Sequence, residues 1–100
     1  ELRHFMGQQK NMAVICGDRH WQYVSVDPIT GLREYSCGPT SNQHAGGFKQ
    51  EYQQPMHRYL NICGGFLSAT VERVNEQPSL TIRHHSVTGE ILNQDQLTAE

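Results

Sequence analysis

The chain has 100 residues, a formal net charge of −2 and 36% hydrophobic residues. This length predicts one modest domain, and its eight lysines and arginines form no basic stripe that would bind nucleic acid. The apolar runs are too short for a membrane span, and the termini are too polar for a signal peptide. Three cysteines without a Cys-x-x-Cys pair argue against a zinc ribbon or a disulfide framework, although one bridge beside one free thiol stays open.

The N-terminal segment is expected to be the end of a helix. Leu2, Phe5 and Met6 recur at helical spacing and form one apolar stripe, which polar residues 8–10 then end. The next run, Met12–Cys16, has the length and β-branched content of a fully buried strand. Such a strand needs cover on both faces, and this chain offers at most one short helix for it. We therefore expect the chain to be the last part of a layered α/β domain, with the upstream half absent.

A carboxylate and an imidazole follow this strand. The strand ends at Gly17, and Asp18 and His20 come next, where open α/β sheets usually bind their ligands. Carboxylate oxygen and imidazole nitrogen are both common metal donors, so the pair forms the start of a metal site. The alternative is a turn carboxylate beside a solvent-facing histidine.

Turn signals predict antiparallel hairpins along the rest of the chain. An Asp-Pro pair followed by Thr-Gly, a second Thr-Gly pair and an Asn-Glu-Gln-Pro segment mark the three connections. Residues 27–31 are expected to connect a strand at 22–26 to one at 32–36. Residues 75–78 connect 66–74 to 80–85, and residues 86–89 connect 80–85 to 90–92. Residues 37–58 remain as a long polar connection, which is typical of functional or mobile segments.

Alternation along the later strands predicts which side chains face the core. Leu67, Ala69 and Val71 alternate with polar residues, as in a half-buried antiparallel strand. By the same parity His84 faces inward and His85 outward, so the two imidazoles point away from one another. We therefore expect His84 to be hydrogen-bonded in the core and not to bind a metal with its neighbour.

Several segments taken together resemble a known family. They are Cys16–Gln22, Asp27–Tyr35, Cys37–Ser41, Gly64–Ser68, Val71–Val74 and Arg83–Gly89. As a set they resemble the C-terminal part of alkaline phosphatase D (PhoD-like) metallophosphoesterases. The resemblance implies a calcineurin-like αββα sandwich that hydrolyses phosphate mono- and diesters at the carboxyl ends of its central strands. It also implies iron with calcium or another divalent metal as cofactors, and a secreted, periplasmic or cell-surface location.

The resemblance also implies roles for individual residues. Asp18 is the expected metal ligand, and His20 is the expected catalytic residue on the metal or on a phosphate oxygen of the substrate. Related metallophosphoesterases usually have Gly-His-x-His here, so Asp18 stands where they have histidine, as in the PhoD-like branch. Arg19, Trp21 and His44 are the expected substrate-binding residues; the alternatives are packing for Trp21 and an exposed loop position for His44. The family's other metal ligands lie in upstream motifs, so residues 1–100 alone are expected to be inactive without the N-terminal part of the domain.

Two other classes of function are consistent with the sequence. The chain could be a stand-alone β-rich interaction module that uses a hairpin edge as its docking surface. It could also be a non-catalytic metal-binding protein in which Asp18, His20 and loop histidines hold one ion. Nucleophilic catalysis by cysteine or serine has less support, because the sequence has no Gly-x-Ser-x-Gly elbow. Neither nucleic acid nor a membrane is an expected partner.

Overall fold

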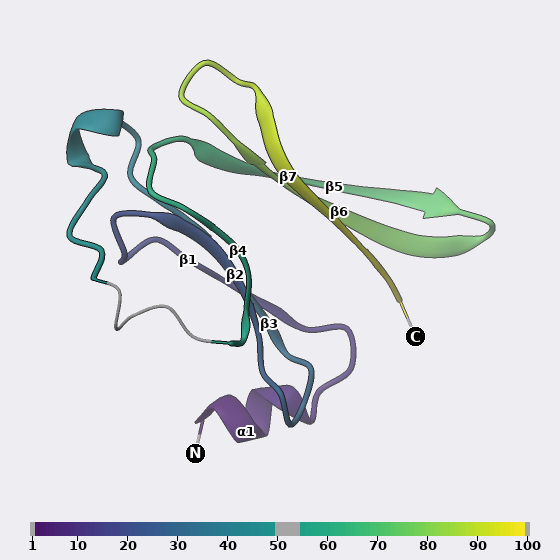
Figure 1. Cartoon of the computed structure of the whole chain (residues 1–100). Helices are drawn as coiled ribbons and strands as arrows, with labels where there is room; N and C mark the ends of the chain where they lie inside the picture. Colours follow the sequence, from purple (N-terminus) through teal and green to yellow (C-terminus); the bar gives the residue numbers. More distant parts are fainter. Residues whose placement is uncertain (1, 50–54, 100) are drawn as a thin grey trace.

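Two open β-sheets face one another and make up nearly all of the computed structural model, which describes residues 2–49 and 55–99 (Figure 1). The strand order is β1-β3-β2-β4 in the first sheet and β5-β6-β7 in the second. The strands are β1 (Ala13–Cys16), β2 (Gln22–Val26), β3 (Arg33–Cys37), β4 (His57–Asn61), β5 (Phe66–Val74), β6 (Gln77–His85) and β7 (Ile91–Thr98). Among these described residues, the helical elements are α1 (Leu2–Gly7) and the 3-10 turn η1 (Asn42–His44), so the β-rich prediction is confirmed.

None of the described residues belongs to a helix that could cross a membrane. The predicted helix end corresponds to α1, and Leu2 and Phe5 of its apolar stripe are exposed. Glu1, at the start of this prediction, lies outside the described residues. Part of the predicted long connection, residues 50–54, also lies outside them.

The predicted hairpin in the first sheet is confirmed. β2 and β3 pair antiparallel around residues 27–32, where the carboxylate of Asp27 accepts hydrogen bonds from the backbone N–H and hydroxyl of Thr30. Gly31 completes this turn at a φ of 79°, which an L side chain rarely adopts. β4, within the expected connection and just beyond it, is an additional strand that pairs antiparallel with β2.

The prediction of a fully buried first strand is wrong. Within the part of the chain that the structure describes, β1 is an edge strand that pairs with β3 alone, in parallel register, and its Ile15 side chain is 59% exposed. Ala13 packs against the core, but the described residues provide no strand beyond β1 and no helix layer over Ile15. Its apolar composition is therefore that of an interior strand, whereas its position is that of an edge.

The second sheet is the predicted meander, with longer strands than expected. β5 and β6 join through a tight turn at Asn75 and Glu76, whose φ angles of 51° and 68° are those of a type I′ turn. The expected half-burial of β5 holds only at its start, where Leu67 packs against the core. Ala69 and Val71 are exposed, because the tip of the β5–β6 hairpin extends past the first sheet (Figure 1).

The core lies between the two sheets. Val24 and Tyr35 of the first sheet meet Ile82 of the second, and all three side chains are at most 1% exposed. Partly buried hydrophobic residues surround this centre: Ala13, Tyr59, Leu67, Leu80 and Leu97. The cluster is small, so polar contacts between the sheets also contribute to their packing.

Gln22 and Asp95 make several of these polar contacts. Gln22 is fully buried, and its amide donates to the carbonyl oxygen of His85 at 3.0 Å and accepts from the Tyr59 hydroxyl at 2.9 Å. Asp95 of β7 accepts from the guanidinium of Arg33 at 3.1 Å and from the hydroxyl of Tyr35 at 2.9 Å. The bonds from Gln22 to His85 and from Asp95 to Arg33 and Tyr35 join the first sheet to the second, whereas the Tyr59 bond holds Gln22 within the first sheet.

Candidate functional site

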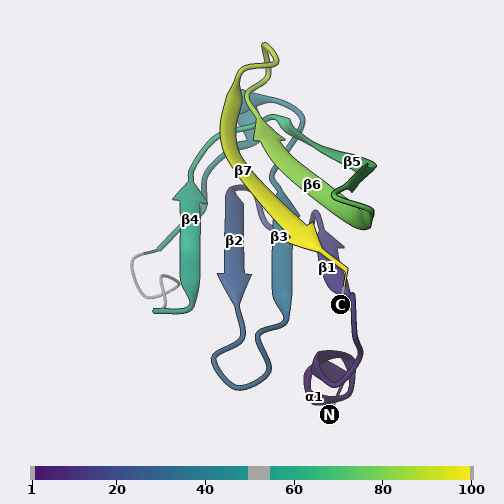
Figure 2. The same cartoon turned by 90° about the vertical axis from the view of Figure 1, so that its right-hand side faces the viewer.

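The loops after β1, β3 and β4 meet at one end of the first sheet. β1 is parallel to β3, and β2 is antiparallel to both β3 and β4. The strands β1, β3 and β4 therefore have their carboxyl ends at the same edge of the sheet (Figure 2). We call this end the loop edge and define it as residues 17–21, 38–48 and 62–65. The predicted site residues Asp18, Arg19, His20, Trp21 and His44 all lie in it.

Backbone hydrogen bonds hold the loops of this edge together. The N–H of Gly46 donates to the carbonyl of His20 at 3.1 Å, which joins the segment after η1 to the candidate metal loop. Gly65 N–H donates to the carbonyl of Pro39 at 2.8 Å. Gly64 N–H donates to the side-chain oxygen of Asn42 at 2.9 Å. The loop edge is thus one packed unit.

Trp21 is the buried anchor of the candidate loop. Its side chain is only 6% exposed, and its ring contacts Phe48 edge-to-face with centroids 5.4 Å apart. The guanidinium carbon of Arg19 lies 5.5 Å from the centre of the same ring, within the range of a cation–π interaction. This burial matches the packing alternative for Trp21 and makes Arg19 the more accessible of the two.

Asp18 and His20 are exposed on either side of Arg19. Within residues 2–49 and 55–99, no group of three or more histidine, cysteine, aspartate or glutamate side chains could hold a metal ion. The described residues therefore do not form a complete metal centre, and ligation by Asp18 and His20 stays a prediction. His44 is exposed at the end of η1, as its loop alternative expects.

The outer face of the first sheet has a polar cluster that was not predicted. The Tyr23 hydroxyl donates to the carboxylate of Glu34 and lies 3.4 Å from the Cys16 sulfur. Burial raises the pKa of the Cys16 thiol and that of the Tyr23 hydroxyl, so both remain protonated near neutral pH. Strand parity could have identified the cluster, because Tyr23 and Glu34 alternate with the core residues Val24 and Tyr35.

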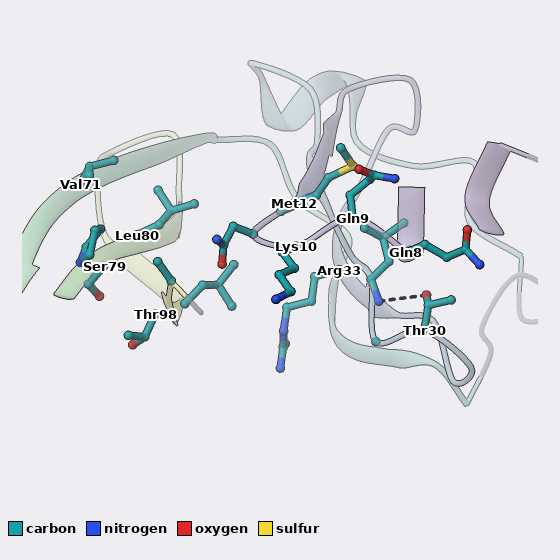
Figure 3. A pocket seen from close by; sticks show the side chains of 18 residues that line it. Gln8, Gln9, Lys10, Met12, Thr30, Arg33, Val71, Ser79, Leu80 and Thr98 are labelled. Carbon is teal, nitrogen blue, oxygen red and sulfur yellow. Dashed lines mark hydrogen bonds between the residues drawn. The ribbon is translucent and has the colours of Figure 1, made fainter. Parts of the chain in front are cut away.

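A cavity of about 430 Å³ opens at the other end of the molecule. It lies between residues 7–13 and 30–33 on one side and the ends of the second sheet on the other (Figure 3). Lys10 and Arg33 extend toward its centre, and Val71, Leu80 and Thr98 come from the opposite side (Figure 3). The cavity is therefore separate from the loop edge and includes none of the predicted site residues.

No protein-family model matches this chain, and comparisons with curated proteins and with solved structures also give no match. The functional argument therefore depends on the residues of the loop edge and on their position in the sheet.

Proposed function

We propose that this chain forms part of a metal-dependent phosphoesterase of the alkaline phosphatase D type, which hydrolyses phosphate mono- or diesters. In this proposal Asp18 is a metal ligand, and His20 binds the metal or a phosphate oxygen of the substrate. The supporting observation is the position of their loop at the carboxyl end of β1, beside the parallel strand β3. Loops in this position are where sheets with parallel strands usually bind ligands.

The proposed fold is the calcineurin-like αββα sandwich. Two facing sheets, with the parallel pair β1 and β3 ending next to the loop edge, are consistent with that architecture. The exposed Ile15 on an otherwise interior type of strand supports further layers around β1. The metals would be iron with calcium or another divalent ion, and the donors beyond Asp18 and His20 would come from outside the described residues.

Arg19 is the proposed phosphate-binding residue. Its guanidinium lies over the Trp21 ring and next in sequence to both candidate metal donors. Guanidinium groups bind phosphate oxygens through paired N–H donors, and an aromatic support restricts their orientation. Trp21, which Phe48 holds in place, then acts on the substrate through Arg19, and His44 lies at the rim.

The activity test uses the protein expressed from its complete coding sequence, with bis(p-nitrophenyl) phosphate as substrate and iron plus calcium supplied. Asp18→Asn should lower kcat/KM by about 100-fold or more, because the amide is a poor metal ligand. The matched control is Glu72→Gln, which neutralises an exposed carboxylate on β5 and should leave the rate unchanged. Equal activity of Asp18→Asn and the unmutated protein would overturn the proposal.

A second measurement separates the alternatives on residues 1–100. Mn²⁺ added during NMR should broaden the amide signals of residues 17–20 before all others, and Asp18→Asn should remove this effect. Broadening without phosphodiester hydrolysis by the complete protein would favour a non-catalytic metal-binding protein. A stable protein with neither property would favour the interaction module.

A further inference from the structure

The outer face of the second sheet contains a serine and a histidine in direct contact. Ser68 of β5 and His85 at the end of β6 lie on the same face, with Ser68 Oγ 2.8 Å from His85 Nε2. The other ring nitrogen, Nδ1, is 3.2 Å from the carbonyl oxygen of Gly89. Because a carbonyl only accepts, Nδ1 carries a proton, and in the neutral ring Nε2 therefore accepts from the Ser68 hydroxyl. A hydroxyl, a neutral imidazole and an orienting acceptor are thus arranged in series.

Neighbouring groups fix the orientation of the imidazole. The Phe66 ring stacks on it with centroids 4.5 Å apart and an angle of 7° between the planes. The carbonyl of Gly89 belongs to the turn between β6 and β7, in which the Gly89 N–H donates to the Ser86 carbonyl at 3.0 Å. The ring of His85 is therefore held by a strand on one side and by a turn on the other.

A positive charge lies across from the serine. Arg83 is the register partner of Ser68, and directly paired residues have Cβ atoms about 4.5–5.5 Å apart on the same face. Its Nε donates to the side-chain oxygen of Gln94 at 2.8 Å, which steadies the guanidinium on this face. The guanidinium is thus held on the β7 side of β6, and its positive charge is on the same face of the sheet as Ser68.

We propose that Ser68 is a nucleophile, activated by His85, that accepts acyl groups from small activated carboxylic esters. Ser68 Oγ attacks the acyl carbon, its proton passes to His85 Nε2, and the carbonyl electron pair moves onto the carbonyl oxygen. Collapse of this intermediate breaks the ester C–O bond, and the alcohol leaves with the proton from the imidazolium. Water then releases the carboxylate through the same two steps. The site is on the second sheet and does not depend on the proposed phosphoesterase function.

The surroundings of Ser68 and His85 indicate the size of the ester that this site would accept. Ser68 and His85 are half-buried on a sheet face, with the Phe66 ring as the adjacent apolar surface. A short acyl group with a good aromatic leaving group fits this arrangement, and p-nitrophenyl acetate is therefore the probe.

The test incubates the protein with p-nitrophenyl acetate and follows p-nitrophenol release and peptide masses. The expected result is an initial burst of p-nitrophenol and one acetyl group on the peptide that contains Ser68. Ser68→Ala should abolish both, and His85→Gln should slow the burst by about 100-fold or more. Thr70→Ala, which changes the next outward-facing position of β5, is the matched control and should acetylate at the unmutated rate.

Two outcomes would overturn the proposal. One is the absence of acetyl-Ser68 in the unmutated protein, which decides the question even where the His85 variant does not fold. The other is an unchanged rate of Ser68 acetylation in a folded His85→Gln protein, with folding checked by circular dichroism.

Discussion

At the scale of single residues, His84 shows how burial sets a protonation state. It is fully buried, and its Nε2 lies 2.9 Å from the carbonyl oxygen of Ser36. This contact requires a proton on Nε2, while Nδ1 has no hydrogen-bond partner among the described residues. Burial lowers the pKa of His84, and the hydrogen bond to Ser36 only partly opposes the shift. The charge of Asp95 also raises this pKa, whereas that of His85 lowers it.

We predict that His84 makes the protein less stable in mild acid. Its pKa is lowered on folding from the ordinary value of 6.5, so the folded state binds fewer protons than the unfolded chain. The contribution to the unfolding free energy is complete above that value and is lost as the pH falls toward the lowered pKa. Each unit of pKa difference is worth about 1.4 kcal/mol. Urea unfolding at about pH 7.5 and about pH 5.5 measures the change.

The control for this prediction is His84→Phe. In the unmutated protein the ring centroids of His84 and Tyr59 are 4.8 Å apart, and phenylalanine keeps a ring at this contact. Loss of the bond to the Ser36 carbonyl should cost about 1–3 kcal/mol near neutral pH. The difference in stability between the two pH values should nevertheless be smaller than in the unmutated protein. An equal pH dependence in both proteins would show that other groups cause it.

At the scale of elements, features set by local sequence were predicted correctly, whereas features set by long-range strand pairing were not. The turns at 27–32 and 86–90 were predictable because the Asp-Pro and Thr-Gly pairs of the first and the Thr-Gly pair of the second act within a few positions. β4 was missed, since it lacks clear alternation and forms by pairing with β2 across a long connection. The burial of β1 was misjudged, because composition reports the environment that suits a strand and not the neighbours it has.

The same distinction applies to the candidate sites. The Asp18–His20 loop was recognisable from sequence because its donors are two positions apart. The Ser68–His85 contact was not, since it depends on the register between β5 and β6 and on the Gly89 turn. Strand parity placed His85 on the outer face, but parity alone does not identify the residue opposite.

The turn between β5 and β6 contains a residue with backbone strain, which a substitution can remove. Glu76 adopts a φ of 68°, where a side chain is unfavourable and glycine is not. Glu76→Gly should stabilise the protein by about 0.5–1 kcal/mol, because Asn-Gly is the preferred pair of a type I′ turn. Thermal and urea unfolding measure the gain.

The comparison for this change is Glu72→Gly on β5, four positions earlier. Glycine within a strand weakens it, so this variant should lose about 0.5–1 kcal/mol. Destabilisation by both substitutions would argue against a type I′ turn at Asn75-Glu76.

At the scale of the whole molecule, stability depends on how closely the two sheets approach. The hydrophobic centre is small, and polar links from Gln22 and Asp95 span the interface. Gly65, between β4 and β5, lies directly against the backbone of the second sheet. A Cβ atom there would lie 1.8 Å from the carbonyl oxygen of His85 and 2.7 Å from the Gln22 amide nitrogen. That carbonyl is the acceptor for the Gln22 link, so the same position controls contact and hydrogen bonding.

We predict that Gly65→Ala unfolds the protein or lowers its unfolding free energy by roughly 3 kcal/mol or more, since backbone must move. Gly89→Ala is the matched comparison, because both glycines have a positive φ, 149° at Gly65 and 95° at Gly89. At Gly89, however, no atom lies within 4 Å of an added Cβ. Its cost should be limited to backbone strain, about 1–2 kcal/mol. Urea unfolding of the two variants separates strain from collision. Similar losses in both would mean that the sheets do not meet at Gly65, and the interface built on Gln22 would then have to be redrawn.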